Sequence, residues 1–160
     1  MIEYQTRDIT DVKMGMICHG VNCQQVMGSG VARAIRDKWP NVYDRYANGP
    51  SGKRALGGCD IINANDSIHE DLFVANCYTQ LNYGKDGAIY ADIEAIRASL
   101  GEAYRMANYY HLHIFMPKIG CGLGVLDWEE DVLQVVEELD DAFKEVNTTV
   151  CILNGEDDEQ

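Results

Sequence analysis

Two glycine-rich segments are the parts of this chain best suited to chemistry. The first runs from Gln25 to Ala32 and the second from Pro117 to Gly124, and each directly follows a short apolar run. A glycine-rich turn between a strand and a helix exposes backbone N–H groups at the positive end of the helix dipole, where phosphate binds. Two such turns at strand ends predict two walls of one pocket that grips a diphosphate.

The glycines within these segments have an ordinary interpretation as well. Gly28 and Gly30 permit close backbone approach to a ligand, but a plain strand-to-helix turn also uses glycine. The first segment lacks the third glycine of a dinucleotide fingerprint, and the sequence contains no GK[ST] P-loop. In the second segment Gly120, Gly122 and Gly124 alternate, which is more glycine than a turn needs. Contact with a ligand explains this excess.

Two titratable side chains are candidate catalytic groups. His19 stands at the carboxyl end of a strand-like run beside the expected pocket, where an imidazole can act as a general base or polarise a phosphate, although a lone histidine is usually structural. Asp127 precedes the last helix, where an N-cap with Glu130 completing a capping box is favoured over a reserve catalytic role. Cys23 and Cys121 lack the C-x5-R pattern of a phosphatase nucleophile and are expected to pack.

The apolar pattern predicts alternating strands and helices. Strands are expected over residues 16–21, 60–63, 71–78, 111–116 and 148–153. Helices are expected from about Val31 to a break at Pro40, along the apolar series from Ile89 to Ala103, and from Val132 to Phe143. This order predicts an α/β domain over residues 1–154 with a largely parallel sheet, helices on both faces and ligands at the carboxyl edge, followed by an acidic tail over residues 155–160.

Composition limits the function classes. The 160 residues fit one domain, and a net charge of -13 disfavours an extended nucleic-acid groove, although backbone amides can still hold a small anion. Six cysteines without a C-x-x-C pair indicate a reducing, cytoplasmic compartment. His111 and His113 share a strand face without a third ligand nearby, so neither a metal nor another cofactor is expected. The first residues lack the layout of a signal peptide, and no apolar run is long enough to span a membrane.

Four segments, in this order, resemble the macro domain family. They are Arg7 to Ile9, Cys18 to Cys23, Met27 to Ala32, and Met116 to Leu123. The resemblance covers nearly the whole chain and is strongest to the branch with ADP-ribose 1″-phosphate phosphatases, terminal ADP-ribose glycohydrolases and phage macro domains. It implies a three-layer α/β/α fold with a mixed, mostly parallel sheet and a cleft for ADP-ribose across the carboxyl edge.

The resemblance also implies roles for individual residues. Asp8 would accept a hydrogen bond from the adenine amino group, and Ile9 would lend its backbone amide. The other implied contacts form three groups: Gly20, Val21 and Asn22, of which the last two face the distal ribose; Gly28, Ser29, Gly30, Val31 and Ala32 at the diphosphate and that ribose; and Ile119, Gly120, Cys121, Gly122, Leu123 and Gly124 over the phosphates.

The activity implied by the resemblance is hydrolysis of ADP-ribose 1″-phosphate, with His19 as the acid or base. The alternatives are a non-catalytic reader of ADP-ribosylation and a hydrolase that removes ADP-ribose from protein or nucleic acid, so nucleic acid is expected only as an ADP-ribosylated substrate. The family's terminal glycohydrolases carry an essential aspartate where this chain has Gly124 and a catalytic lysine near the position of Gln80 or Leu81. A lysyl mechanism is therefore not expected.

Overall fold

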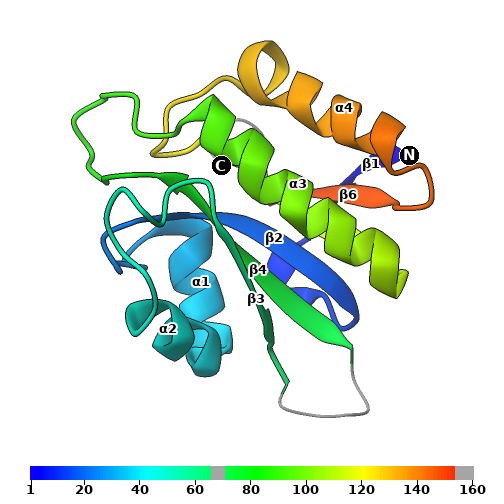
Figure 1. The fold of residues 1–160 in the computed structure, drawn as a ribbon, viewed down its shortest axis with the longest axis horizontal. Coiled ribbons are helices and arrows are strands. Elements are labelled where there is room, and N and C mark those ends of the chain that lie inside the picture. The colour runs from blue at the N-terminus through cyan, green and yellow to red at the C-terminus, as the bar shows by residue number, and fades with distance from the viewer. Residues whose placement is uncertain (66–70, 154–160) are drawn as a thin grey trace.

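A six-stranded sheet lies between two pairs of helices in the computed structural model, which describes residues 1–65 and 71–153 (Figure 1). The strand order is β1-β6-β5-β2-β4-β3, and every neighbouring pair is parallel except β3 and β4. The predicted α/β/α fold with a mixed, mostly parallel sheet is confirmed. The acidic tail expected over residues 155–160 lies outside the described residues.

The element bounds are as follows. The strands are β1 (Ile2–Thr6), β2 (Gly15–Asn22), β3 (Cys59–Asn63), β4 (Leu72–Gln80), β5 (Ile114–Met116) and β6 (Thr148–Ile152). The helices are η1 (Ile9–Asp11), α1 (Gly30–Lys38), α2 (Pro40–Ala47), α3 (Ile93–Tyr110), the π-helical turn η2 (Trp128–Val132) and α4 (Leu133–Ala142).

The sheet is covered on both faces, and β2 shows how its sequence achieves this. Met16 and Cys18 pack into the apolar cluster beneath α3 and α4, whereas Ile17 between them packs toward α1 and α2. All three are buried. A strand buried on both faces is a nearly continuous apolar run, because successive side chains point to opposite faces. The carboxyl end of β2 is thereby fixed between both helical layers.

The long helix begins later than the apolar series predicts. The carboxylate of Asp92 accepts hydrogen bonds from Glu94 N and Ala95 N at 2.9 and 3.1 Å, so it caps α3 at Ile93. Ile89 is 70% exposed and lies before this cap, so its placement in the helix was wrong. A capping carboxylate satisfies the unpaired N–H groups of the first turn, and this local chemistry overrides the three- and four-residue spacing.

Larger differences from the prediction occur at Pro40, at the strand before Pro117 and at the end of the final helix. Pro40 ends α1 as expected, but it also begins α2, which the sequence pattern did not predict, because proline is well suited to a first helical position. The strand expected over residues 111–116 covers only Ile114–Met116, since His111 ends α3 in the left-handed conformation with φ 58°. The final helix ends before Phe143, which is its C-cap.

Candidate functional site

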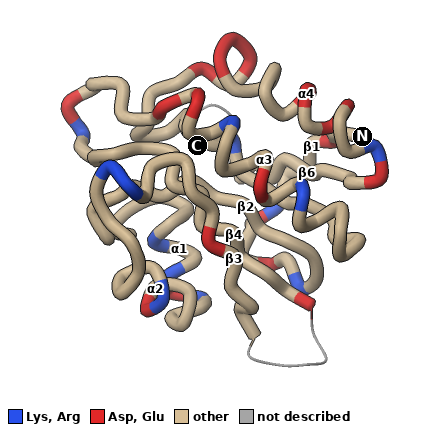
Figure 2. Tube along the Cα trace, viewed as in Figure 1, with Lys and Arg blue, Asp and Glu red and all other residues tan. Residues whose placement is uncertain are grey.

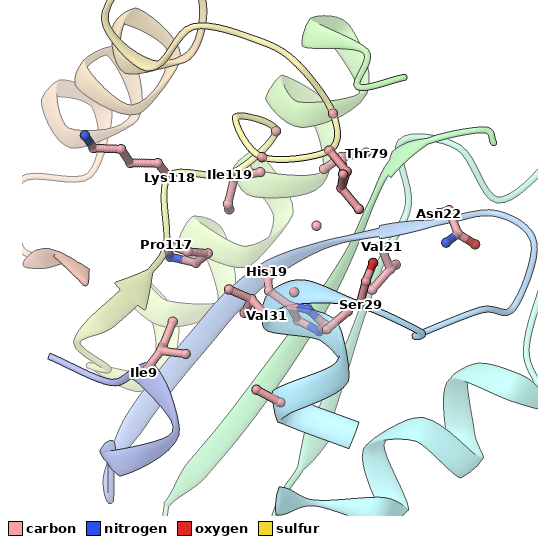
Figure 3. Close-up of a pocket in the computed structure, with 18 of the residues that line it drawn as sticks. Ile9, His19, Val21, Asn22, Ser29, Val31, Thr79, Pro117, Lys118 and Ile119 are labelled. Atoms are coloured by element: carbon pink, nitrogen blue, oxygen red, sulfur yellow. The ribbon is translucent and has the colours of Figure 1, made fainter. Parts of the chain in front are cut away.

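A cleft of about 650 Å³ opens at the carboxyl edge of the sheet. Figure 3 shows it extending from Ile9 at one end to Asn22 at the other, with the start of α1 on one side and the loop after Ile119 on the other. Both glycine-rich segments line it, so the predicted arrangement of two walls around one pocket is confirmed. Parallel strands place their carboxyl ends together, which is why segments distant in sequence meet here.

The first wall is the start of α1. Ser29 is extended with φ -154° and its side chain makes no capping hydrogen bond, while Gly30 has φ +60°. The first backbone N–H bonded back into this turn is that of Arg33, which donates to Ser29 O at 3.2 Å. The preceding amides lack the partners that a helix interior would supply. They are therefore available to an anion.

The second wall is a loop that is held by its own backbone. Leu126 N donates to Gly120 O at 2.9 Å, and Gly124 O accepts from both Tyr90 N and Ala91 N at 3.3 Å. The amides of Gly122 and Gly124 donate to no backbone group outside regular elements in the described part of the chain. These two amides remain available to a ligand.

Cys121 is the residue of the second segment that does not fit its expected role. It is not among the described residues that line the cleft, and its amide donates to Lys118 O at 3.2 Å. Its thiol packs against the apolar core, and burial, followed by the charge of Asp127, raises the thiol pKa to about 12. The structure supports the expectation that this cysteine packs, and it leaves Cys121 outside the described lining of the cleft.

The cleft differs in charge from the rest of the protein. Its described lining contains three basic residues, Arg7, Lys85 and Lys118, and one acidic residue, Asp8. The whole chain has 26 acidic residues against 13 basic ones. The acidic residues gather elsewhere, for example along η2 and α4 (Figure 2). A cleft with this local excess of positive charge attracts a small anion to an acidic protein.

Asp8 lies at the Ile9 end of the cleft and has a structural duty as well. One carboxylate oxygen, Oδ1, accepts from Thr10 N at 2.9 Å and from Thr10 Oγ1 at 2.7 Å, which caps η1. A carboxylate has a second oxygen and about four lone-pair positions in all. Asp8 can therefore hold η1 and accept a hydrogen bond from a ligand at the same time.

Asn22 lies at the opposite end and is engaged by the protein itself. Its Oδ1 accepts from Tyr46 Oη at 2.8 Å and from Gln24 N at 2.9 Å, while its Nδ2 donates to Val26 O at 2.8 Å. The side chain shapes the first glycine-rich segment from within, and one N–H of the amide is left for a ligand.

His19 lies in the floor of the cleft and is almost fully buried. It is 1% exposed, and its Nε2 is 2.6 Å from Oδ1 of Asn76, its register partner on β4. Burial lowers the pKa of His19 to about 4, although the hydrogen bond to Asn76 opposes that shift. Nδ1 has no hydrogen-bond partner among the described residues. The imidazole is therefore neutral at pH 7. It can accept a proton as a base, but it does not carry the additional proton that an imidazolium would donate as an acid.

Asp127 is an N-cap, as the sequence favours. Its Oδ1 accepts from Glu130 N at 2.8 Å. The reciprocal bond of the expected capping box is made by Asp131, whose carboxylate accepts from Asp127 N at 2.8 Å, and not by Glu130. Asp127 is exposed and is not among the described residues that line the cleft. The structure thus gives Asp127 a capping role outside the described lining of the cleft.

All the other expected ligand residues line the cleft, together with several residues to which the sequence assigned no ligand contact. The additional residues are at or beyond the carboxyl ends of β1, β4, β5 and β6 and in the first glycine-rich segment and α1: Arg7, Val26, Ala34, Thr79, Gln80, Tyr83, Lys85, Pro117, Lys118, Cys151 and Leu153. Applying the carboxyl-edge rule to every parallel strand would have found most of them.

The described residues contain neither a metal-binding cluster nor a membrane-spanning helix. No group of three or more His, Cys, Asp or Glu side chains within residues 1–65 and 71–153 is arranged to hold a metal ion. No helix in the described part of the chain is long and apolar enough to cross a membrane.

A mixed, mostly parallel sheet between two helical layers, with a glycine-walled cleft at its carboxyl edge, defines a three-layer α/β/α class of domain. The sequence profile of the Macro domain family matches residues 18–136, and the chain belongs to this family.

Named relatives show the same family relationship. A DNA ADP-ribosyl glycohydrolase of Mycobacterium tuberculosis is 24% identical over 147 residues, which is 91% of this chain but 40% of the relative. The chain thus spans less than half the length of that protein. An ADP-ribose 1″-phosphate phosphatase of Scheffersomyces stipitis is 26% identical over 137 residues, covering 73% of this chain and 79% of the relative. The macrodomain of Mycobacterium tuberculosis DarG has a TM-score of 0.77 at 21% identity, covering 94% of this chain and 97% of that one.

Proposed function

We propose that the cleft binds ADP-ribose and that the protein hydrolyses ADP-ribose 1″-phosphate to ADP-ribose and phosphate. The observation that carries this proposal is that both glycine-rich segments line one cleft and contain amides without a backbone partner in the described part of the chain. In the proposed complex the adenine lies toward Asp8 and Ile9, the diphosphate between the two walls, and the distal ribose toward Val21 and Asn22. The phosphatase of Scheffersomyces stipitis, which this chain resembles over most of its length, supports the choice of reaction.

Catalysis in this proposal depends chiefly on position and electrostatics. Amides and cationic side chains around the cleft hold the substrate and stabilise negative charge that develops on the transferred phosphoryl group. Water attacks phosphorus while the bond between phosphorus and the 1″-oxygen breaks, which releases phosphate and leaves ADP-ribose after the 1″-oxygen takes up a proton. Neutral His19 is the candidate general base that accepts a proton from the attacking water.

The test is turnover of ADP-ribose 1″-phosphate by the parent protein and by His19→Ala. A base contributes roughly 10²- to 10⁴-fold, so kcat should fall by that factor while ADP-ribose affinity changes little. Gly122→Glu is the binding control, because a carboxylate in the second wall repels the diphosphate and should abolish ADP-ribose binding. Parent-like turnover by folded His19→Ala would remove His19 from the mechanism. Binding of ADP-ribose without any turnover by the parent would instead identify a reader of ADP-ribosylation.

A second candidate function is removal of ADP-ribose from a macromolecule. Lys85 lines the cleft on the loop after β4, so an amine is present there although Gln80 and Leu81 stand near the position of the lysine in the terminal glycohydrolases. The relative named DNA ADP-ribosyl glycohydrolase matches more of this chain than the named phosphatase does. This candidate would be favoured if the parent released ADP-ribose from an ADP-ribosylated oligonucleotide and Lys85→Gln did not. The variant should at the same time still hydrolyse ADP-ribose 1″-phosphate.

A further inference from the structure

A second cavity, of about 520 Å³, lies apart from the cleft, and we call it the Tyr78 pocket. It is lined by residues from the end of α2, the loop between α2 and β3, and strands β3 and β4, including Arg45, Gly49, Arg54 and Tyr78. No described residue lines both cavities. Figure 2 shows basic residues on the loop between α2 and β3, on a chain whose net charge is -13.

The central observation is the hydroxyl group of Tyr78. The side chain is 2% exposed, and its Oη has no hydrogen-bond partner among the described residues. A buried hydroxyl without a partner costs the free energy of its lost hydration, so such a group in a native structure calls for an explanation. A ligand atom that accepts a hydrogen bond in the pocket supplies one.

Two glycines of the pocket lining border the tyrosine side chain. A Cβ on Gly49 would lie 3.1 Å from Arg45 O and 3.8 Å from Tyr78 Oη, and a Cβ on Gly58 would lie 3.0 Å from Ala55 O and 3.8 Å from Cδ2 of the same ring. Backbone, with no side chain from these two residues, therefore lies beside the tyrosine.

The charged side chains of the pocket determine the chemistry of the ligand. Arg45 Nη2 donates to Asp60 Oδ1 at 3.1 Å, so the only described acidic residue of the lining is already paired. Arg54 makes no ion pair in the described part of the chain, and it is exposed. Burial, followed by the charge of Asp60, raises the pKa of Tyr78 to about 12, which keeps its hydroxyl protonated as a donor. The pocket thus offers two guanidinium groups and one hydroxyl donor.

We propose that the Tyr78 pocket binds a phosphate group, either as inorganic phosphate or as a phosphate monoester. A guanidinium group donates two parallel hydrogen bonds to two phosphate oxygens, and the opposite charges strengthen these bonds. A neutral ligand lacks this charge. In the bound state Tyr78 Oη donates to one oxygen, and Arg54 and the free N–H groups of Arg45 donate to the others. This site is independent of the cleft and of the function proposed for it.

The test is a titration of the ¹⁵N-labelled protein with inorganic phosphate and, separately, with ribose 5-phosphate. The amide signals of Gly49 and Gly58 should shift and saturate, with half-saturation on the order of 1–10 mM. Phosphate that binds in the cleft would instead move the signals of Gly120 and Gly122, so the two sites are read separately. Tighter binding of ribose 5-phosphate would identify a monoester as the occupant, and equal or weaker binding would identify inorganic phosphate.

Variants decide whether the named side chains are responsible. Arg54→Gln should weaken phosphate binding about tenfold or more, and Tyr78→Phe about three- to tenfold. Lys144→Gln removes the same charge from an exposed residue beyond α4 and should change binding less than about twofold. Absence of saturable shifts at Gly49 and Gly58, or equal effects of Arg54→Gln and Lys144→Gln, would overturn the proposal.

Stability of the ligand-free protein provides a second measurement. Because Tyr78 Oη has no partner before the ligand binds, Tyr78→Phe should unfold at the parent's melting temperature or above it, and phosphate should raise the melting temperature of the parent more than that of the variant. A lower melting temperature of Tyr78→Phe without phosphate would show that the hydroxyl already has a partner, which would contradict the proposal.

Discussion

The two glycine-rich walls look alike in sequence but use their glycines for different reasons. In the first wall a Cβ on Gly30 would meet nothing within 4 Å, and one on Gly28 would lie 3.5 Å from Val26 Cγ1. In the second wall a Cβ on Gly124 would lie 2.6 Å from Gly120 O and 2.9 Å from Ala91 Cβ. The protein's own packing requires glycine at 124, whereas the space beside Gly28 is free for a ligand. A glycine pattern therefore reports a close approach without saying whether protein or ligand makes it.

The largest effect that separates the walls is on stability. Gly124→Ala should lower the free energy of unfolding by about 3 kcal/mol, because the new methyl group overlaps a backbone oxygen that cannot move aside cheaply. Gly28→Ala should change it by less than about 1 kcal/mol while weakening ADP-ribose binding. Urea unfolding and calorimetry measure the two effects. If Gly124→Ala proves as stable as the parent, the second wall is as open as the first and the contrast between them disappears.

The same question, whether the protein or the ligand requires a residue, applies to His19. Its pKa is about 4 in the folded protein and about 6.5 in the unfolded chain. The unfolded state therefore binds more protons between these values, so the stability contributed by His19 is complete above pH 6.5 and is lost as the pH falls toward 4. The shift corresponds to roughly 3 kcal/mol at most. Unfolding measured across this range should show the decline in the parent.

A variant isolates this effect from the carboxylates, which also titrate in acid. His19→Gln cannot take up the proton, so its stability should decline less steeply than that of the parent between pH 6.5 and pH 4. Equal slopes would show that His19 is protonated in the folded protein and that its imidazole reaches water. A protonated His19 would in turn restore the role of general acid in the proposed reaction.

Asp8 serves both the protein and the proposed ligand, and two substitutions separate the two duties. Asp8→Ala removes the cap of η1 together with the adenine contact, and ADP-ribose affinity should fall by roughly 1.5–3 kcal/mol, the range for a hydrogen bond to a charged group. Asp8→Asn keeps an oxygen for Thr10 N and should weaken binding less, since a neutral acceptor is weaker. Unchanged affinity of Asp8→Ala in calorimetry would assign Asp8 to the cap alone.

The sequence predicted those parts of the fold and site that depend on one pattern at a time. The strands around Ile17 and Val74 are continuous apolar runs, and both cleft walls carry glycine, so these were found directly. The second helix at Pro40 was missed because proline both ends and begins helices. The hydrogen bond between His19 and Asn76 depends on the pairing of β2 with β4, and the neutral state of the imidazole depends on its burial. Neither can be predicted from the residues around His19 alone. Lys85 and Tyr83 reach the cleft from a loop that has no motif.

The smallest expected effect concerns Asp127, which we expect to serve only the protein's own structure, as a helix cap, and not the ligand. Asparagine caps helices about as well as aspartate, so Asp127→Asn should change the free energy of unfolding by less than about 0.5 kcal/mol, whereas Asp127→Ala should cost about 1 kcal/mol through the lost bond to Glu130 N. Turnover of ADP-ribose 1″-phosphate should equal that of the parent in both variants, because Asp127 is exposed and is not among the described residues lining the cleft. A loss of kcat in Asp127→Asn with unchanged stability would contradict this assignment. The second wall would then have to move for the carboxylate to reach the substrate. Ligand binding, and not only the protein's own packing, would then determine the position of that wall.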